Sequence, residues 1–136
     1  MIAAYEEVLR DPQIDAAVLA TPHAKHHEQI VAAAKAGKHV HVEKPLTLTR
    51  ASAEQGIDAC RRAEVTMSIG FNRRHAPSIV EMLRRIRAGD IGDVLHVEAH
   101  FSGPTGYGLK PGIWRSTRVE APGGGMTARG IHTSMR

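Results

Sequence analysis

The stretch Gly37-Lys-His-Val-His-Val-Glu-Lys-Pro-Leu46 decides how this chain folds. A β-rich run ends there directly in Glu43-Lys44-Pro45. Pro45 ends the strand, because proline lacks an N–H group and has a fixed φ. In a parallel sheet Lys44 would then lie at the carboxyl edge, where open α/β sheets bind ligands. Partial burial lowers the pKa of a lysine and suits it to proton exchange near neutral pH, although a solvated lysine at a strand end fits the spacing equally well.

Strand-like and helix-like segments alternate on both sides of this stretch. Apolar runs predict strands at residues 16–20, 39–42 and 66–70, and the first of these suits a strand buried on both faces of its sheet. The segments between and around them predict helices over residues 5–10, 24–36, from Thr47 or Thr49 to 63, and from Pro77 to Gly89. Strands joined through helices imply right-handed parallel crossovers. The predicted fold class is therefore α/β, with half of a doubly wound parallel sheet.

The pattern changes after Gly92. Residues 94–101 alternate, with apolar side chains on one face and His96, Glu98 and His100 on the other. This alternation predicts an amphipathic strand of an open sheet. The three polar residues would lie about 6.5 Å apart along the strand, which is wide for a single metal ion, so a polar sheet face that serves subunit pairing is the favoured interpretation.

The change of pattern also predicts a domain boundary at residues 89–93. It divides the chain into residues 1–92 and residues 93–136. A loop rich in glycine and proline follows over residues 102–125, and a helix should begin near Met126.

Composition and charge narrow the class of protein. The 136 residues are 42% hydrophobic and 24% charged, which is typical of a soluble globular domain. The net charge is +4 and most basic residues are arginine, which suits phosphate or carboxylate ligands. Nucleic acid is disfavoured as a partner, because there is no basic tail and no aromatic stripe. A single cysteine, Cys60, fits the reducing cytoplasm, and no apolar run is long enough to span a membrane.

Five ordered blocks resemble the Gfo/Idh/MocA oxidoreductases, the family of glucose–fructose oxidoreductase and inositol dehydrogenase. They are A-T-P-x-x-x-H (20–26), A-x-x-A-G-K-H-V (33–40), E-K-P-L (43–46), G-F-N-R-R (70–74) and G-G-G-x-x-x-x-G-I-H (123–132). The resemblance implies the C-terminal half of a Rossmann-type parallel sheet, followed by the start of an α+β substrate domain. No G-x-G-x-x-G motif is present, so we expect an internal fragment that is inactive alone. A homo-oligomer formed through the C-terminal sheet is also implied.

The same resemblance implies roles for individual residues. Lys44 would exchange a proton with the substrate hydroxyl while a hydride passes to NAD or NADP, and His132 would face it and share the acid–base work. Arg73 would contact the substrate together with these two. The residues implied for cofactor binding are Thr21, Pro22, His26, Glu43, Lys44, Pro45, Asn72, Trp114 and Arg115. For several of these a plain turn or ordinary packing is the simpler interpretation.

One departure from the family pattern concerns His132. Many members carry an aspartate four residues before this histidine, where this chain has Ala128. Either Lys44 and His132 work without that carboxylate, or the site is degraded. The function implied is NAD(P)-dependent oxidation of a hydroxyl, or reduction of a ketone, on a sugar or polyol-like substrate, and the alternative is a non-catalytic binding or assembly module. No metal is expected, because no cysteine or carboxylate completes a site with His23, His26 and His27.

Overall fold

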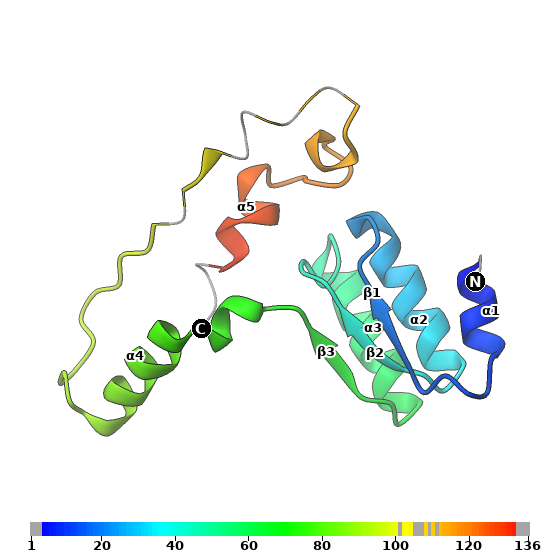
Figure 1. The fold of residues 1–136 in the computed structure, drawn as a ribbon, viewed down its shortest axis with the longest axis horizontal. Coiled ribbons are helices and arrows are strands. Elements are labelled where there is room, and N and C mark those ends of the chain that lie inside the picture. Colours follow the sequence, from blue (N-terminus) through cyan, green and yellow to red (C-terminus); the bar gives the residue numbers. More distant parts are fainter. Residues whose placement is uncertain (1–3, 101, 105–107, 109, 111, 133–136) are drawn as a thin grey trace.

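A three-stranded parallel sheet forms the centre of the N-terminal part (Figure 1). The computed structural model describes residues 4–100, 102–104, 108, 110 and 112–132. The strands are β1 (Ala16–Leu19), β2 (His39–Val42) and β3 (Met67–Ile69), in the order β1-β2-β3. Val42 pairs with Leu19 on one side and with Ile69 on the other. The predicted α/β class with a parallel sheet is confirmed.

Three helices accompany the sheet. They are α1 (Tyr5–Arg10), α2 (His26–Lys35), which follows the short 3-10 turn η1 (His23–Lys25), and α3 (Arg50–Arg62). Thr49 is the N-cap of α3, because its side chain accepts a hydrogen bond from the Ser52 N–H group, as the sequence predicted for one of two threonines. Gly37 follows α2 with φ +70°, a conformation that glycine adopts without strain.

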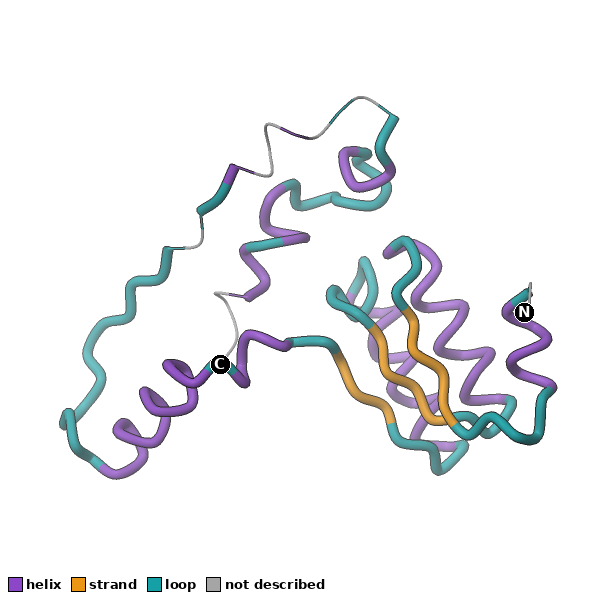
Figure 2. Tube along the Cα trace, viewed as in Figure 1, coloured by secondary structure: helices purple, strands orange, loops and turns teal. Residues whose placement is uncertain are grey.

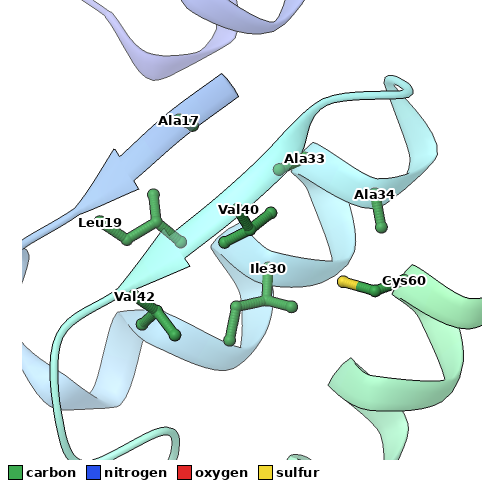
Figure 3. Close-up of a cluster of buried hydrophobic side chains, with 8 residues drawn as sticks. All are labelled: Ala17, Leu19, Ile30, Ala33, Ala34, Val40, Val42 and Cys60. Atoms are coloured by element: carbon green, nitrogen blue, oxygen red, sulfur yellow. The ribbon is translucent and has the colours of Figure 1, made fainter. Parts of the chain in front are cut away.

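The core lies between the sheet and helices α2 and α3 (Figure 3). Alternate strand residues point inward, so that Ala17, Leu19, Val40 and Val42 are buried. Ile30, Ala33 and Ala34 of α2 and Cys60 of α3 cover them. Small residues predominate, which lets the two helices approach the sheet and each other closely.

The prediction that the first strand is buried on both faces is wrong for the described residues. The Val18 side chain points away from the core and is 73% exposed. The strands follow one another in sequence order, so both right-handed crossovers place their helices on the same face. The other face of the sheet keeps no helix among the described residues.

The chain after β3 leaves the sheet through the 3-10 turn η2 (Asn72–His75) and helix α4 (Pro77–Ala88). Pro77 starts this helix, and Gly89 ends it with φ +76°, as predicted. The predicted strand over residues 94–101 does not form: residues 94–100 are irregular and exposed, and Phe101 lies outside the described residues. Alternation makes a strand only where a neighbour accepts its backbone hydrogen bonds, and no described strand lies there. Oligomerisation through this segment stays a prediction, as does the domain boundary at residues 89–93.

Residues 112–132, called the returning segment below, turn back toward the sheet (Figure 2). The segment contains the 3-10 turn η4 (Trp114–Ser116), the short helix α5 (Gly125–Ala128) and the 3-10 turn η5 (Gly130–His132). Helix α5 begins one residue before Met126, close to the predicted start. No helix in the described ranges is both long enough and apolar enough to cross a membrane.

Candidate active site

The carboxyl ends of the three strands form one edge, and the returning segment faces it (Figure 1). Thr21 and Pro22 follow β1, Glu43 to Pro45 follow β2, and Asn72 and Arg73 follow β3. Two backbone hydrogen bonds extend the sheet to this edge: Glu43 N–H donates to the Leu19 carbonyl at 2.9 Å, and Gly70 N–H donates to the Val42 carbonyl at 2.8 Å. The turns after the strands are therefore held side by side by the sheet itself.

Lys44 lies half-buried at this edge, directly after β2. Burial lowers the pKa of its ammonium group, the Arg115 guanidinium lowers it further, and the Glu43 carboxylate opposes them. A lysine whose pKa is lowered holds a larger neutral fraction near neutral pH, and the neutral amine accepts a proton. A role of Lys44 in proton transfer stays a prediction.

Glu43 depends on a neighbouring glycine for its position. A Cβ atom placed on Gly70 would lie 3.1 Å from the Glu43 carboxyl carbon, closer than ordinary packing contacts. A glycine at this position therefore leaves room for the Glu43 carboxylate beside the backbone after β3. The Glu43 carboxylate also accepts a hydrogen bond from the Lys44 N–H group at 3.3 Å. Sequence reasoning missed Gly70, although it stands first in the G-F-N-R-R block.

His132 reaches the same edge from the last turn, η5. Its ring packs edge-on against the Phe71 ring, with ring centroids 6.3 Å apart and planes at 83°. Burial lowers the pKa of the His132 imidazole, the charges of Lys44 and Arg73 lower it further, and Glu43 opposes them. The charge of Lys44 therefore acts on a ring that lies 88 positions later in the sequence. A neutral imidazole there is a second proton acceptor.

His26 has a different place from the one that the resemblance implied. Its ring is 0% exposed, so a cofactor cannot touch it in this arrangement. Nδ1 lies 2.8 Å from the Pro45 carbonyl oxygen, and Nε2 lies 3.0 Å from the Thr21 carbonyl oxygen. The histidine therefore ties the turn after β1 to the turn after β2. The expectation of a direct cofactor contact is replaced by a positioning role.

The remaining predicted residues surround the edge to different degrees. The Thr21 hydroxyl donates a hydrogen bond to the Gln29 side-chain oxygen, while Asn72 and Arg73 are exposed after β3. Trp114 is half-buried, and its ring meets the His23 ring edge-on at 5.1 Å. The Arg115 guanidinium lies over the Trp114 ring, 4.3 Å from its centroid.

Two residues that sequence reasoning did not assign to the site join the returning segment to the first part of the chain. The His23 ring is 6% exposed and donates a hydrogen bond from Nδ1 to the Glu120 carbonyl at 2.7 Å. The Glu120 carboxylate accepts a hydrogen bond from the Ala24 N–H group at 2.9 Å. No local pattern signals these contacts, because their partners lie 96 or 97 positions apart in the sequence.

The described residues contain no group of three or more histidine, cysteine, aspartate or glutamate side chains placed to hold a metal ion. The His100 ring nitrogen Nε2 lies 2.8 Å from the Glu98 carboxylate in the exposed, irregular segment after α4. The titratable and charged groups that act on one another at the carboxyl edge are Lys44, His132, Glu43, Arg73 and Arg115.

Comparisons with known proteins agree with this arrangement. The family model described as "Oxidoreductase family, NAD-binding Rossmann fold" (Gfo/Idh/MocA) matches residues 1–71. The scyllo-inositol 2-dehydrogenase (NAD(+)) of Bacillus subtilis is 40% identical over 90 residues, which are 66% of this chain and 26% of that protein. The 1,5-anhydro-D-fructose reductase of Ensifer adhaerens is 33% identical over 131 residues, which are 90% of this chain and 36% of that protein.

Solved structures share the backbone arrangement as well. The crystal structure of an NAD-binding protein from Listeria innocua superposes with a TM-score of 0.85 and 31% sequence identity, covering 97% of this chain and 37% of that one. The chain thus spans between about a quarter and somewhat more than a third of the length of the proteins it matches.

Proposed function

This chain belongs to the Gfo/Idh/MocA oxidoreductases, a family with an NAD-binding Rossmann fold, and we propose that it carries the proton-transfer residues of an NAD(P)-dependent dehydrogenase. The substrate would be a sugar or polyol, which is oxidised at a hydroxyl group or reduced at a ketone. The names of the inositol dehydrogenase and anhydrofructose reductase relatives support this substrate class. One observation carries the proposal. Lys44 at the carboxyl edge of the sheet lies close enough to His132 for its charge to act on that ring, and both side chains have a lowered pKa.

The residues at the edge fit the reacting end of a nicotinamide cofactor. The turns after three parallel strands present polar groups there, and Lys44 is half-buried next to them. When bound, the nicotinamide ring takes or gives the hydride. This chain has no glycine-rich motif, so we assign none of its residues to the pyrophosphate.

Lys44 acts as the principal proton carrier in this proposal. The neutral amine accepts the proton of the substrate hydroxyl as the carbon–hydrogen bond breaks and its electron pair leaves with the hydride, so that a ketone forms. In the reverse direction the ammonium returns the proton to the ketone oxygen. Burial and the Arg115 charge lower the pKa of Lys44, which favours the neutral amine, while Glu43 limits how far the pKa falls.

The other residues hold the reactants. His132 accepts or passes on the proton as a second base, and Arg73 binds oxygen atoms of the substrate as a hydrogen-bond donor. We assign Thr21, Pro22, Glu43, Pro45, Asn72, Trp114 and Arg115 to the cofactor side. His26 acts indirectly, by fixing the turns that contain Thr21 and Pro45.

Because this chain is expected to be inactive alone, steady-state kinetics on a panel of polyols, with NAD+ and NADP+, tests the proposal on the longer parent protein that contains it. Lys44→Ala should lower turnover by about 10²–10⁴-fold while cofactor affinity changes little. Lys44→Arg should not restore it, because a guanidinium stays protonated and cannot accept a proton. His132→Ala should be milder, since Ala128 provides no carboxylate to polarise the ring. Lys25→Ala, at an exposed lysine of η1, is the matched control.

Two results would contradict this assignment. If Lys44→Ala keeps turnover while His132→Ala loses it, the principal acid–base residue is His132. If no polyol turns over with either cofactor, the alternative of a non-catalytic binding or assembly module is favoured. Ala128 and the lack of a glycine-rich motif in this chain are the observations in favour of that alternative.

A further inference from the structure

The returning segment contacts the start of α2 through three groups of residues 114–120. The Glu120 carboxylate accepts from the Ala24 N–H group at 2.9 Å, and the Glu120 carbonyl accepts from the His23 ring at 2.7 Å. The Trp114 ring completes the contact by packing edge-on against the His23 ring, with ring centroids 5.1 Å apart. We call the set of Glu120, Trp114 and His23 the docking contact.

The Glu120 carboxylate suits the start of a helix, where N–H groups need partners. The first N–H groups of a helical segment lack partners inside it, and a carboxylate there also meets the positive end of the helix dipole. A hydrogen bond to a charged oxygen is stronger than one between neutral groups. His23 is almost completely buried, and its ring contacts the Trp114 and His26 rings, whose centroids lie 5.1 and 5.8 Å away. Few alternative positions of the segment would satisfy all of these groups at once.

Local hydrogen bonds keep Trp114 and Glu120 at a fixed spacing. The Thr117 hydroxyl donates to the Trp114 carbonyl at 2.8 Å and accepts from the Glu120 N–H group at 3.3 Å. The Ala121 N–H group closes the turn by donating to the Thr117 carbonyl at 3.0 Å. Residues 114–120 therefore dock as one unit.

We propose that Glu120 and His23 are positioning residues, which dock the turn of residues 114–120 on the start of α2 and so hold Arg115 at the edge where Lys44 lies. Arg115 follows Trp114 directly, and its guanidinium lies 4.3 Å from the centroid of the Trp114 ring. A fixed Trp114 therefore limits where the Arg115 charge can go. That charge is one of the three influences that set the pKa of Lys44. The functional part of this proposal rests on the dehydrogenase role given above.

Trp114 offers a direct readout, because it is the sole tryptophan of the chain. In Glu120→Ala and in His23→Ala the turn should undock, so that Trp114 fluorescence shifts to longer wavelength and acrylamide quenches it more strongly. Glu120→Gln should stay near the wild type, because the amide oxygen still accepts the Ala24 hydrogen bond. Glu54→Ala removes another exposed carboxylate, one that is paired with Arg50, and serves as the control. Far-ultraviolet circular dichroism checks that each variant is folded.

A second readout follows the charge on Lys44. The extent of acylation of Lys44 by an amine-reactive reagent is measured by mass spectrometry as a function of pH, with Lys35, an exposed lysine in the last turn of α2, as the reference. Without the docking contact the Arg115 charge moves away, so the pKa of Lys44 should rise and its acylation should shift to higher pH in Glu120→Ala. In the protein as an enzyme, kcat/KM should fall by up to about 10²-fold in Glu120→Ala, as expected for a misplaced site.

The outcomes separate the two proposals. Unchanged Trp114 fluorescence in Glu120→Ala would overturn the docking role, and an exposed Trp114 with unchanged Lys44 acylation would overturn the link to Arg115. Neither the fluorescence measurement nor the acylation measurement requires the protein to turn over a substrate. Absence of activity in the wild type would therefore contradict the proposed function, while the docking contact would still be decided by fluorescence and acylation.

Discussion

Helices α2 and α3 meet where Ile30 faces Gly56. We predict that the effect of Gly56→Ala on the free energy of unfolding changes sign when Ile30 is replaced by alanine. Ile30 is 0% exposed at the centre of the core (Figure 3). A Cβ atom added to Gly56 would lie 3.3 Å from the Ile30 Cγ2 atom and 3.9 Å from its Cδ1 atom. The first distance is shorter than the optimal carbon–carbon separation of about 3.5–4.0 Å. The methyl group added by Gly56→Ala would therefore crowd the Ile30 Cγ2 methyl group.

The expected free energies follow from this geometry. Overpacking costs about 1–3 kcal/mol, and alanine gains about 0.5–1 kcal/mol over glycine inside a helix, so Gly56→Ala alone should lower the free energy of unfolding by about 0–2.5 kcal/mol. Ile30→Ala should lower it by about 2–5 kcal/mol. In that background Cγ2 is absent, so adding Gly56→Ala should raise the free energy of unfolding by about 0.5–1 kcal/mol. The sign of the Gly56→Ala effect thus reverses.

Urea unfolding followed by circular dichroism measures all four proteins, provided that the denaturant dependence m is the same in each. Ile30→Val is the matched control: it costs about 0.5–1.5 kcal/mol and keeps both Cγ atoms, so Gly56→Ala should remain unfavourable beside it. An equal effect of Gly56→Ala in the wild-type, Ile30→Ala and Ile30→Val backgrounds would refute the reasoning, because the contact at Cγ2 would then carry no energy.

Two further predictions concern pH. Burial, with the charges of Lys44 and Arg73, lowers the pKa of His132 in the folded protein below the ordinary histidine value of 6.5, so the unfolded state binds more protons there. The free energy of unfolding should therefore decrease as the pH falls below 6.5 and level off below the folded pKa. His132→Gln should remove this part of the pH dependence. Burial, with a smaller effect of Glu6, raises the pKa of Tyr5 from 10.0 to about 12, and the Tyr5 hydroxyl donates a hydrogen bond to the Gln29 carbonyl at 2.8 Å. The stability that Tyr5 contributes below pH 10 should therefore be lost between pH 10 and 12. Tyr5→Phe should remove the late phase from an ultraviolet tyrosinate titration.

Features with a local cause could be predicted from the sequence. Thr49 begins α3 because its hydroxyl accepts a hydrogen bond three residues ahead, and Gly37 and Gly89 end helices because glycine adopts positive φ. Lys44 was placed at the carboxyl edge because Pro45 ends β2. Each of these depends on residues within one or two turns of the chain.

Features that depend on a distant partner could not be predicted in the same way. The alternation of residues 94–100 matches a strand, yet the segment lacks a neighbouring strand among the described residues and stays irregular. His26 was expected at the cofactor, but its ring is buried between two carbonyl groups that come from different turns. Glu120 shows no signal in the sequence, because its carboxylate binds the Ala24 N–H group, which lies 96 positions away.

The order of influences on Lys44 explains why a lysine beside a glutamate still has a lowered pKa. Glu43 is adjacent in sequence and opposes the shift, but its side chain is exposed, so water and salt screen its charge. Burial of Lys44 is not screened in this way, and it is the largest influence. The neighbouring turn is fixed from the buried side, where His26 contacts the carbonyl groups of Pro45 and Thr21. The direction of the Lys44 pKa shift is therefore set by burial more than by its charged neighbour in the sequence.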